Sequence, residues 1–167
     1  MKLACRSPST QVGLLFPDRE RAFSGLDQGS SRGGKTVPSQ GQDLEERTEA
    51  FFAAITRGEW EKATQQIHPS ASALQNAVGQ ETNARELLQS MQAMVGSLES
   101  LNYENVRRVV GADAVVEQHD VCMVRKDGTE VRLDVCIILR FDSEGMIIRI
   151  DEYFDSAAAA RLQASAS

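Results

Sequence analysis

Two carboxylates are candidates for acid–base chemistry, and both lie on segments whose side chains alternate between two faces as in a β-strand. The last such segment carries Glu152 on one face among apolar side chains, namely Met146, Ile148, Ile150 and Phe154. An ionised carboxylate buried alone among such neighbours costs several kcal/mol. We therefore expect Glu152 to face a polar cavity, to have a partner or to stay protonated. Asp151 falls on the other, mixed face beside Arg149 and is expected to be a surface charge.

A second strand-like segment, residues 114–125, offers two sets of polar side chains. Gln118 and Asp120 alternate onto one face, whereas Glu117 and His119 alternate onto the other. If the first face points inward, Gln118 and Asp120 share a concavity with Glu152. If the second face does, Glu117 and His119 take that place. Alternation alone leaves both arrangements open.

Asp120 and Glu152 together would form an acid–base pair. Two carboxylates in a poorly solvated pocket repel each other, so one pKa rises and the pair divides into a proton donor and a proton acceptor. The competing interpretation is a structural pair, in which Gln118, Asn76 or a backbone amide binds each carboxylate.

The two histidines are expected to be structural. His119 fits a sheet-face histidine paired with Glu117, and His68 fits a capping or packing residue at a helix end before Pro69. Neither the histidines nor the three cysteines have the spacing of a metal site. No glycine-rich phosphate loop occurs between a strand and a helix. We expect neither a metal nor a cofactor.

Composition limits the partners and the compartment. The chain has 167 residues and a net charge of -6, which argues against a nucleic-acid surface. Its longest apolar stretch is far shorter than the roughly 20 residues of a membrane helix, so no membrane contact is expected. Three cysteines are an odd number, and two of them fall in apolar runs. These features indicate a reducing compartment, and we expect a cytoplasmic protein.

Residues 1–42 differ in composition from the rest of the chain. They are rich in Ser, Gly, Gln and Arg, and they carry six basic residues against three acidic ones. Residues 43–167 carry 12 basic and 21 acidic residues. We predict a disordered tail over residues 1–42, with a leader as the less favoured alternative, and one domain over residues 43–163.

The domain begins with helices. The spacing of apolar residues predicts one helix from residue 43 to a close at Gly58, and a short second one from residue 60 that stops by His68. A third helix is predicted to begin at the capping box formed by Asn83 and Glu86. A last helix is predicted after the strands; it starts after Asp155 or Ser156, either of which can cap it, and runs to about Leu162.

The strands follow the first three helices. They are predicted over residues 102–110, 114–125, 130–141 and 146–154, and each junction has the residues of a tight turn. Consecutive hairpins imply antiparallel pairing. The order of elements is typical of an α+β fold, in which helices cover one face of a curved, mainly antiparallel sheet.

Four segments resemble the SnoaL-like branch of the nuclear transport factor 2-like superfamily. They are Arg57-Gly58-Glu59-Trp60, Ile67-His68-Pro69, Leu74-Gln75-Asn76 and the run from Gly145 to Asp155. The resemblance covers about residues 43–163. It implies a cone-shaped roll, in which a strongly curved sheet wraps a pocket and helices close the back.

Limonene epoxide hydrolase, a member of that superfamily, gives the most similar set of site residues. Its Asp-Arg-Asp relay, with a Tyr and an Asn, positions the water that opens the epoxide. The resemblance places Asn76 on that Asn, and Asp120 and Glu152 on the two Asp residues. Leu74 replaces the Tyr and Gln118 replaces the Arg. It thus implies that Gln118 and Asp120 face the pocket and that the neighbouring histidine faces away.

The resulting hypothesis is a small-molecule enzyme that isomerises, cyclises, dehydrates or opens the epoxide of a small apolar substrate. Asp120 would act as base and Glu152 as acid, while Asn76, Gln118 and Leu74 would bind the substrate. The alternative hypothesis is a non-catalytic ligand-binding or dimerisation module of the same fold. The mixed outer face of the sheet suggests a homodimer formed through the sheet.

Overall fold

The structure, a computed structural model, describes residues 40–158 and residue 160. The predicted tail therefore lies outside the described residues, except for its last three positions. These open the first helix, which begins at Gln40 and not at Asp43. The predicted last helix is described only at its start. There, residues 156–158 are helical and the side chain of Asp155 accepts a hydrogen bond from the N–H of Ala157 at 2.9 Å.

Three helices precede or interrupt the strands: α1 (Gln40–Thr56), α2 (Trp60–Gln65) and α3 (Ala84–Val95). Gly58 follows α1 with a φ of 71°, a left-handed conformation that glycine adopts without strain, as predicted. Asn83 caps α3, because its Oδ1 accepts a hydrogen bond from the N–H of Arg85 at 2.8 Å. No helix in the described part of the chain is long and apolar enough to cross a membrane.

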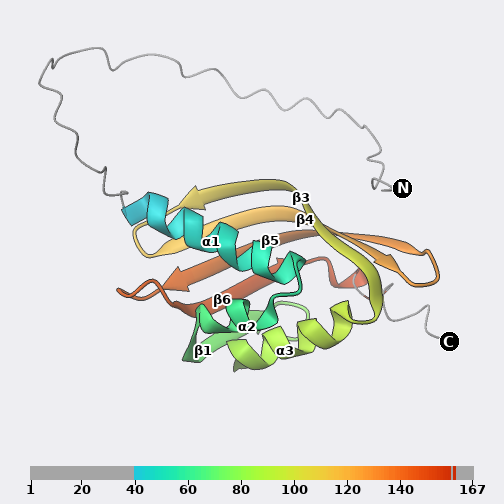
Figure 1. Ribbon diagram of the computed structural model, residues 1–167, viewed down its shortest axis with the longest axis horizontal. Helices are drawn as coiled ribbons and strands as arrows, with labels where there is room; N and C mark the ends of the chain where they lie inside the picture. The colour runs from blue at the N-terminus through green and yellow to red at the C-terminus, as the bar shows by residue number, and fades with distance from the viewer. Residues whose placement is uncertain (1–39, 159, 161–167) are drawn as a thin grey trace, which may run out of the picture. The chain divides into compact units, whose positions relative to one another are not determined.

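The strands form one six-stranded sheet. They are β1 (Ile67–Gln75), β2 (Glu81–Asn83), β3 (Leu98–Val110), β4 (Ala114–Arg125), β5 (Glu130–Phe141) and β6 (Ile147–Phe154). The spatial order is β2-β1-β6-β5-β4-β3, and every pair is antiparallel except β1 with β6, which is parallel. The three helices lie on one face of this sheet (Figure 1). The predicted α+β architecture is confirmed.

His68 occupies a different place from the one predicted. Because α2 ends at Gln65, His68 lies inside β1 and not at a helix end. Its Nδ1 is 2.8 Å from the hydroxyl oxygen of Ser70, a contact between exposed side chains. The short strand β2, which pairs with β1, has no counterpart in the sequence prediction.

The face of the sheet that the helices cover is called the inner face, and the opposite face the outer face. On β5 the inner side chains alternate without a break, and all are buried: Val131, Leu133, Val135, Ile137, Leu139 and Phe141. Ile137, Leu139 and Phe141 pack with residues of α1 into one hydrophobic cluster. Val131, Leu133 and Val135 belong to a second cluster with residues of β3 and β4. The inner face is therefore apolar except where a polar side chain interrupts it.

The last strand departs from the predicted alternation at its start. The pairing of β5 with β6 shifts between the partners of Arg140 and Phe141, so that Ile148 is an extra residue. Ile147 is buried as a result, whereas Ile148 is 39% exposed, the reverse of the prediction. From Arg149 onward the predicted alternation holds, and Glu152 lies on the inner face.

Removal of a core side chain tests this assignment of faces. Leu139 is fully buried, so Leu139→Ala should lower the free energy of unfolding by about 2–5 kcal/mol, measured by urea denaturation. Val109 on β3 is 71% exposed, and Val109→Ala should change that free energy by less than about 0.5 kcal/mol. Equal losses in the two variants would contradict the assignment.

Candidate functional site

Several polar or ionisable side chains interrupt the apolar inner face. Four of them are Tyr103 of β3, Glu117 and His119 of β4, and Glu152 of β6. The strand register places Glu117 and Glu152 on either side of Ile137, in one row across β4, β5 and β6. We call these four residues, together with Arg108 of β3, the inner cluster.

Glu117 is the most deeply buried ionisable group of the inner cluster, with 1% of its surface exposed. Arg108 donates from Nε to one of its carboxylate oxygens at 2.6 Å, and the Nδ1 of His119 lies 2.7 Å from the other. A buried carboxylate is stable only when such donors compensate it. Glu117 therefore holds His119 in the tautomer that carries its proton on Nδ1, which leaves Nε2 as a proton acceptor.

Aromatic rings enclose the imidazole of His119. Its centroid is 4.7 Å from that of Tyr103 and 5.2 Å from that of Phe52 on α1. Glu117 is its one hydrogen-bond partner among the described residues. His119 is thus a buried imidazole that is oriented at one nitrogen and has its other nitrogen available, the arrangement that general bases have.

Tyr103 carries a buried phenol oxygen with no hydrogen-bond partner in residues 40–158 or 160. Burial raises the pKa of this phenol, and the negative charges of Glu152 and Glu117 raise it further. The hydroxyl therefore keeps its proton at any physiological pH. A buried donor without a partner costs free energy, and it can recover that cost by binding an acceptor oxygen of a ligand.

Glu152 is the member of the inner cluster that comes from β6. Burial raises its pKa above the ordinary value, although a hydrogen bond from Gln75 and the nearby His119 act in the opposite direction. The Gln75 amide donates from Nε2 to a carboxylate oxygen of Glu152 at 2.5 Å. The inward orientation predicted for Glu152 is thus correct, and the raised pKa makes it suited to donating a proton.

The raised pKa of Glu152 predicts a pH-dependent stability. Because folding favours the protonated form, this group's stabilising contribution is present below its ordinary pKa of 4.5 and is lost as pH rises through the higher pKa of the folded state. Glu152→Gln keeps an acceptor for Gln75 but cannot ionise. Urea denaturation from pH 4.5 to pH 7.5 should show the wild type losing stability relative to this variant. A constant difference between the two would contradict the shift.

Asp120 and Gln118 lie on the outer face, so the placement that the family resemblance implied is wrong for both. Asp120 accepts a hydrogen bond from the Asn105 amide at 2.6 Å and pairs with Arg132. Burial alone would raise the pKa of Asp120, but the bonds from Asn105 and Arg132 hold it below its ordinary value. Glu117 and His119 instead join Glu152, which is the arrangement that strand alternation had left open.

Leu74 and Asn76 also lie outside the inner cluster, contrary to prediction. Leu74 is opposite Asp151 in the register of β1 and β6, on the outer face. Asn76 donates from Nδ2 to the carbonyl of Phe154 at 2.9 Å and accepts from its N–H at 3.1 Å. Both functional groups of the Asn76 amide are thus used to hold the chain after β1 against the end of β6.

Asp151 is not the surface charge that its strand face suggested. Only 9% of its surface is exposed, and both of its carboxylate oxygens accept hydrogen bonds from Nε of Arg149. Arg149 also reaches Ser72 on β1 and pairs with Glu81 on β2. This network joins β6, β1 and β2 on the outer face, and it has no part in the inner cluster.

The structural role of Asn76 can be measured directly. Asn76→Ala removes two hydrogen bonds between β1 and β6 and should lower the free energy of unfolding by about 1–3 kcal/mol. Asn102 is an exposed amide on β3, and Asn102→Ala serves as the matched control with little expected change. If Asn76→Ala left stability unchanged, the amide would be free for another role.

Sequence reasoning did not identify Tyr103 or Arg108 as functional residues, and it expected His119 to be structural. Glu117 appeared there as the partner of His119 and, with His119, as the alternative inward-facing pair; its pairing with His119 is present. The uninterrupted apolar alternation of β5 was the signal that could have placed Glu117 and His119 inward. Among the residues described, His, Cys, Asp and Glu side chains form no group of three or more that could hold a metal ion.

Comparison with known proteins identifies the family. The sequence profile of the SnoaL-like domain matches residues 48–150 of this chain. No curated protein matches it in sequence. Many solved structures share its fold, and three of them are described here.

PrhC from Penicillium brasilianum has a TM-score of 0.67 at 15% identity, covering 75% of this chain and 89% of its own. A protein of Xanthomonas campestris pv. campestris, provisionally described as a polyketide cyclase, has a TM-score of 0.65 at 15% identity, covering 74% of this chain and 99% of its own. An LEH-like epoxide hydrolase of M. tuberculosis has a TM-score of 0.62 at 16% identity, covering 74% and 91%. At such identities these likenesses establish the cone fold alone.

Proposed function

The chain belongs to the SnoaL-like family, and we propose that it is a small-molecule enzyme that moves protons within the inner cluster. The observation that carries this proposal is the Tyr103 hydroxyl, a buried donor without a partner in the described residues, set among His119, Glu117 and Glu152. In a core with only a structural role, a buried donor is normally hydrogen-bonded. A substrate oxygen would give it a partner.

Three of the side chains would divide the chemistry. His119 would take a proton from an acidic C–H of the substrate through Nε2, because Glu117 holds its Nδ1 proton in place. Tyr103 would donate a hydrogen bond to the substrate oxygen on which negative charge develops. Glu152, whose pKa is raised, would deliver a proton to the product, and transfer of the proton from His119 to Glu152 would restore the starting state.

The substrate would be small and mostly apolar, with one carbonyl or similar oxygen. The rings of Phe52 and Tyr103 and the aliphatic side chain of Ile137 surround the polar groups, and apolar walls with few polar groups are typical of such sites. Isomerisation or cyclisation of a carbonyl compound uses this set of groups. The role predicted for Asp120 thus passes to His119, whereas Glu152 keeps the role predicted for it.

Matched substitutions test the proposal. The purified full chain is assayed with 5-androstene-3,17-dione for double-bond isomerisation, with limonene-1,2-epoxide for hydrolysis, and with a polyketide-like β-ketoester for ring closure. On a substrate that turns over, Tyr103→Phe should lower kcat by about 10²–10³-fold, and Glu152→Gln by about 10²–10⁴-fold. Both variants change one polar atom only, so circular dichroism should show them folded.

The outer face supplies the controls. Tyr153→Phe removes the hydroxyl of a tyrosine that is 45% exposed, and Asp120→Asn neutralises the outer carboxylate. Both should leave kcat unchanged. Loss of activity in Asp120→Asn but not in Glu152→Gln would overturn the assignment of the inner cluster. A wild-type chain that turns over no substrate of the panel would favour a non-catalytic binding module.

A further inference from the structure

The outer face carries a hollow whose lining residues, apart from His119, have no role in the proposed reaction. It has a volume of about 340 Å³, within the usual range of small-molecule sites, and its lining includes Arg107, Gln118, Asp134, Cys136 and Tyr153. A second hollow, lined by Asn105, Val106, Arg107 and Asp120, adjoins it. The lining of the first hollow also includes His119 and Val135, which belong to the inner face, whereas Tyr103, Glu117 and Glu152 line neither hollow.

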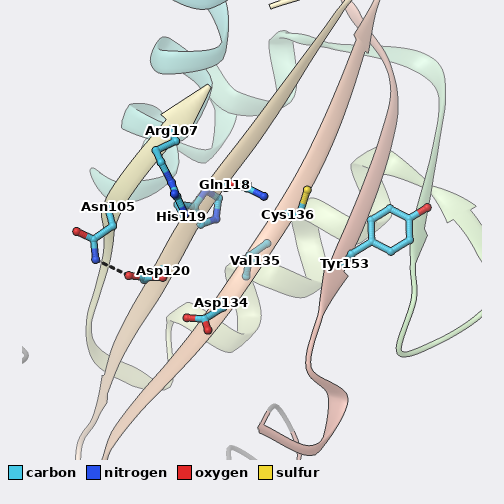
Figure 2. A pocket seen from close by; sticks show the side chains of 9 residues that line it. All are labelled: Asn105, Arg107, Gln118, His119, Asp120, Asp134, Val135, Cys136 and Tyr153. Carbon is cyan, nitrogen blue, oxygen red and sulfur yellow. Dashed lines mark hydrogen bonds between the residues drawn. The ribbon is translucent and has the colours of Figure 1, made fainter. Parts of the chain in front are cut away.

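Four side chains of the first hollow form one row across the sheet. The register pairs Arg107 with Gln118, Gln118 with Cys136, and Cys136 with Tyr153, so the row crosses β3, β4, β5 and β6. Figure 2 shows the row from Arg107 at one side to Tyr153 at the other. Three strand spacings give it a length of roughly 14 Å between the outermost backbones.

The row is chemically unsatisfied, in contrast to its neighbours. No hydrogen bond or ion pair joins Arg107, Gln118, Cys136 or Tyr153 through its side chain to another described residue. Arg132 and Asp120, which lie further along β5 and β4 on the same face, are bound to each other. Arg107 is therefore a cation without a counter-ion in the described part of the chain; it lies beside the Gln118 amide, and the exposed ring of Tyr153 lies at the other end of the row.

We infer that the outer hollow binds a small organic monocarboxylate with an apolar or aromatic body. Arg107 binds the carboxylate, because a guanidinium offers two parallel donors to its two oxygens. Gln118 donates or accepts beside it. The body of the ligand lies over Cys136 and ends against the ring of Tyr153, which is 45% exposed.

The charge around the hollow selects a monoanion. Arg132 pairs with Asp120, and the neutral Asn105 amide donates a hydrogen bond to it, but no cation pairs with Asp134 in the described residues. Asp134 lies directly opposite Asp120 in the register of β4 and β5. A second carboxylate on the ligand would therefore meet the negative charge of Asp134, whereas a neutral body would not.

Cinnamate and its neutral amide, cinnamamide, test this inference because they share shape and differ in charge. Both are titrated into the full ¹⁵N-labelled chain, and amide resonances are followed by NMR. Cinnamate should shift the resonances of Arg107, Gln118, Cys136 and Tyr153 and should bind about tenfold more tightly than cinnamamide. Arg107→Gln should abolish that preference. The control is Arg140, an exposed arginine on β5 that does not line the hollow, and Arg140→Gln should keep the preference for cinnamate.

Three outcomes would overturn the inference. The first is the absence of shifts at about 10 mM cinnamate, a concentration that reveals even weak binding. The second is a set of shifts confined to Tyr103, Glu117 and Glu152, which would assign the ligand to the inner cluster. The third is a dimer by sedimentation that Arg107→Glu dissociates, because a second copy would then occupy the hollow. None of these results depends on whether the inner cluster is catalytic.

Discussion

The buried carboxylate of Glu117 is stable only because residues of β3 and β4 bind it. Leaving it ionised and alone would cost several kcal/mol, and Arg108 and His119 together compensate it. Arg108 also approaches Glu49 of α1 at 3.8 Å, so the same cation lies between the helix and the sheet. Because Glu117 fixes the proton of His119 on Nδ1, a requirement of stability also leaves Nε2 as the proton acceptor of this imidazole.

The β4–β5 hairpin decides which side chains can join that cluster. Gly128 takes a φ of 85° in its turn, the N–H of Thr129 bonds to the Asp127 side chain at 2.9 Å, and Val124 pairs with Glu130. That register pairs odd-numbered residues of β4 with odd-numbered residues of β5. Since the odd residues of β5 are the apolar ones, burying them turns Glu117 and His119 inward and leaves Asp120 outside.

The sequence allowed most of the architecture to be predicted, because long strands with strong turn signals fix their own bounds. The predicted limits of β4 and β5 match the structure, and Glu152 was placed inward from its own alternation. The prediction of the site failed on one question, which face of β4 points inward. Because β4 carries polar residues on both faces, the family resemblance was used to choose, and it placed the inward residues one position out of register. The apolar alternation of β5 and the turn at Gly128 held the deciding information. The outward orientation of Ile148 was not predicted, because nothing in the residue types of a strand marks the extra residue of a β-bulge.

A second irregularity shows why local pattern cannot reveal the whole cluster. Tyr103 pairs with Val121 and Arg108 pairs with Glu117, although Tyr103 and Arg108 are an odd number of residues apart and would lie on opposite faces of a regular strand. The register of β3 shifts between Glu104 and Arg107, where Asn105 has a φ of 52°. This bulge turns Arg108 inward to meet Glu117 and turns Arg107 outward into the hollow. One extra residue in an edge strand therefore supplies the cation of the inner cluster and the unpaired cation of the outer face.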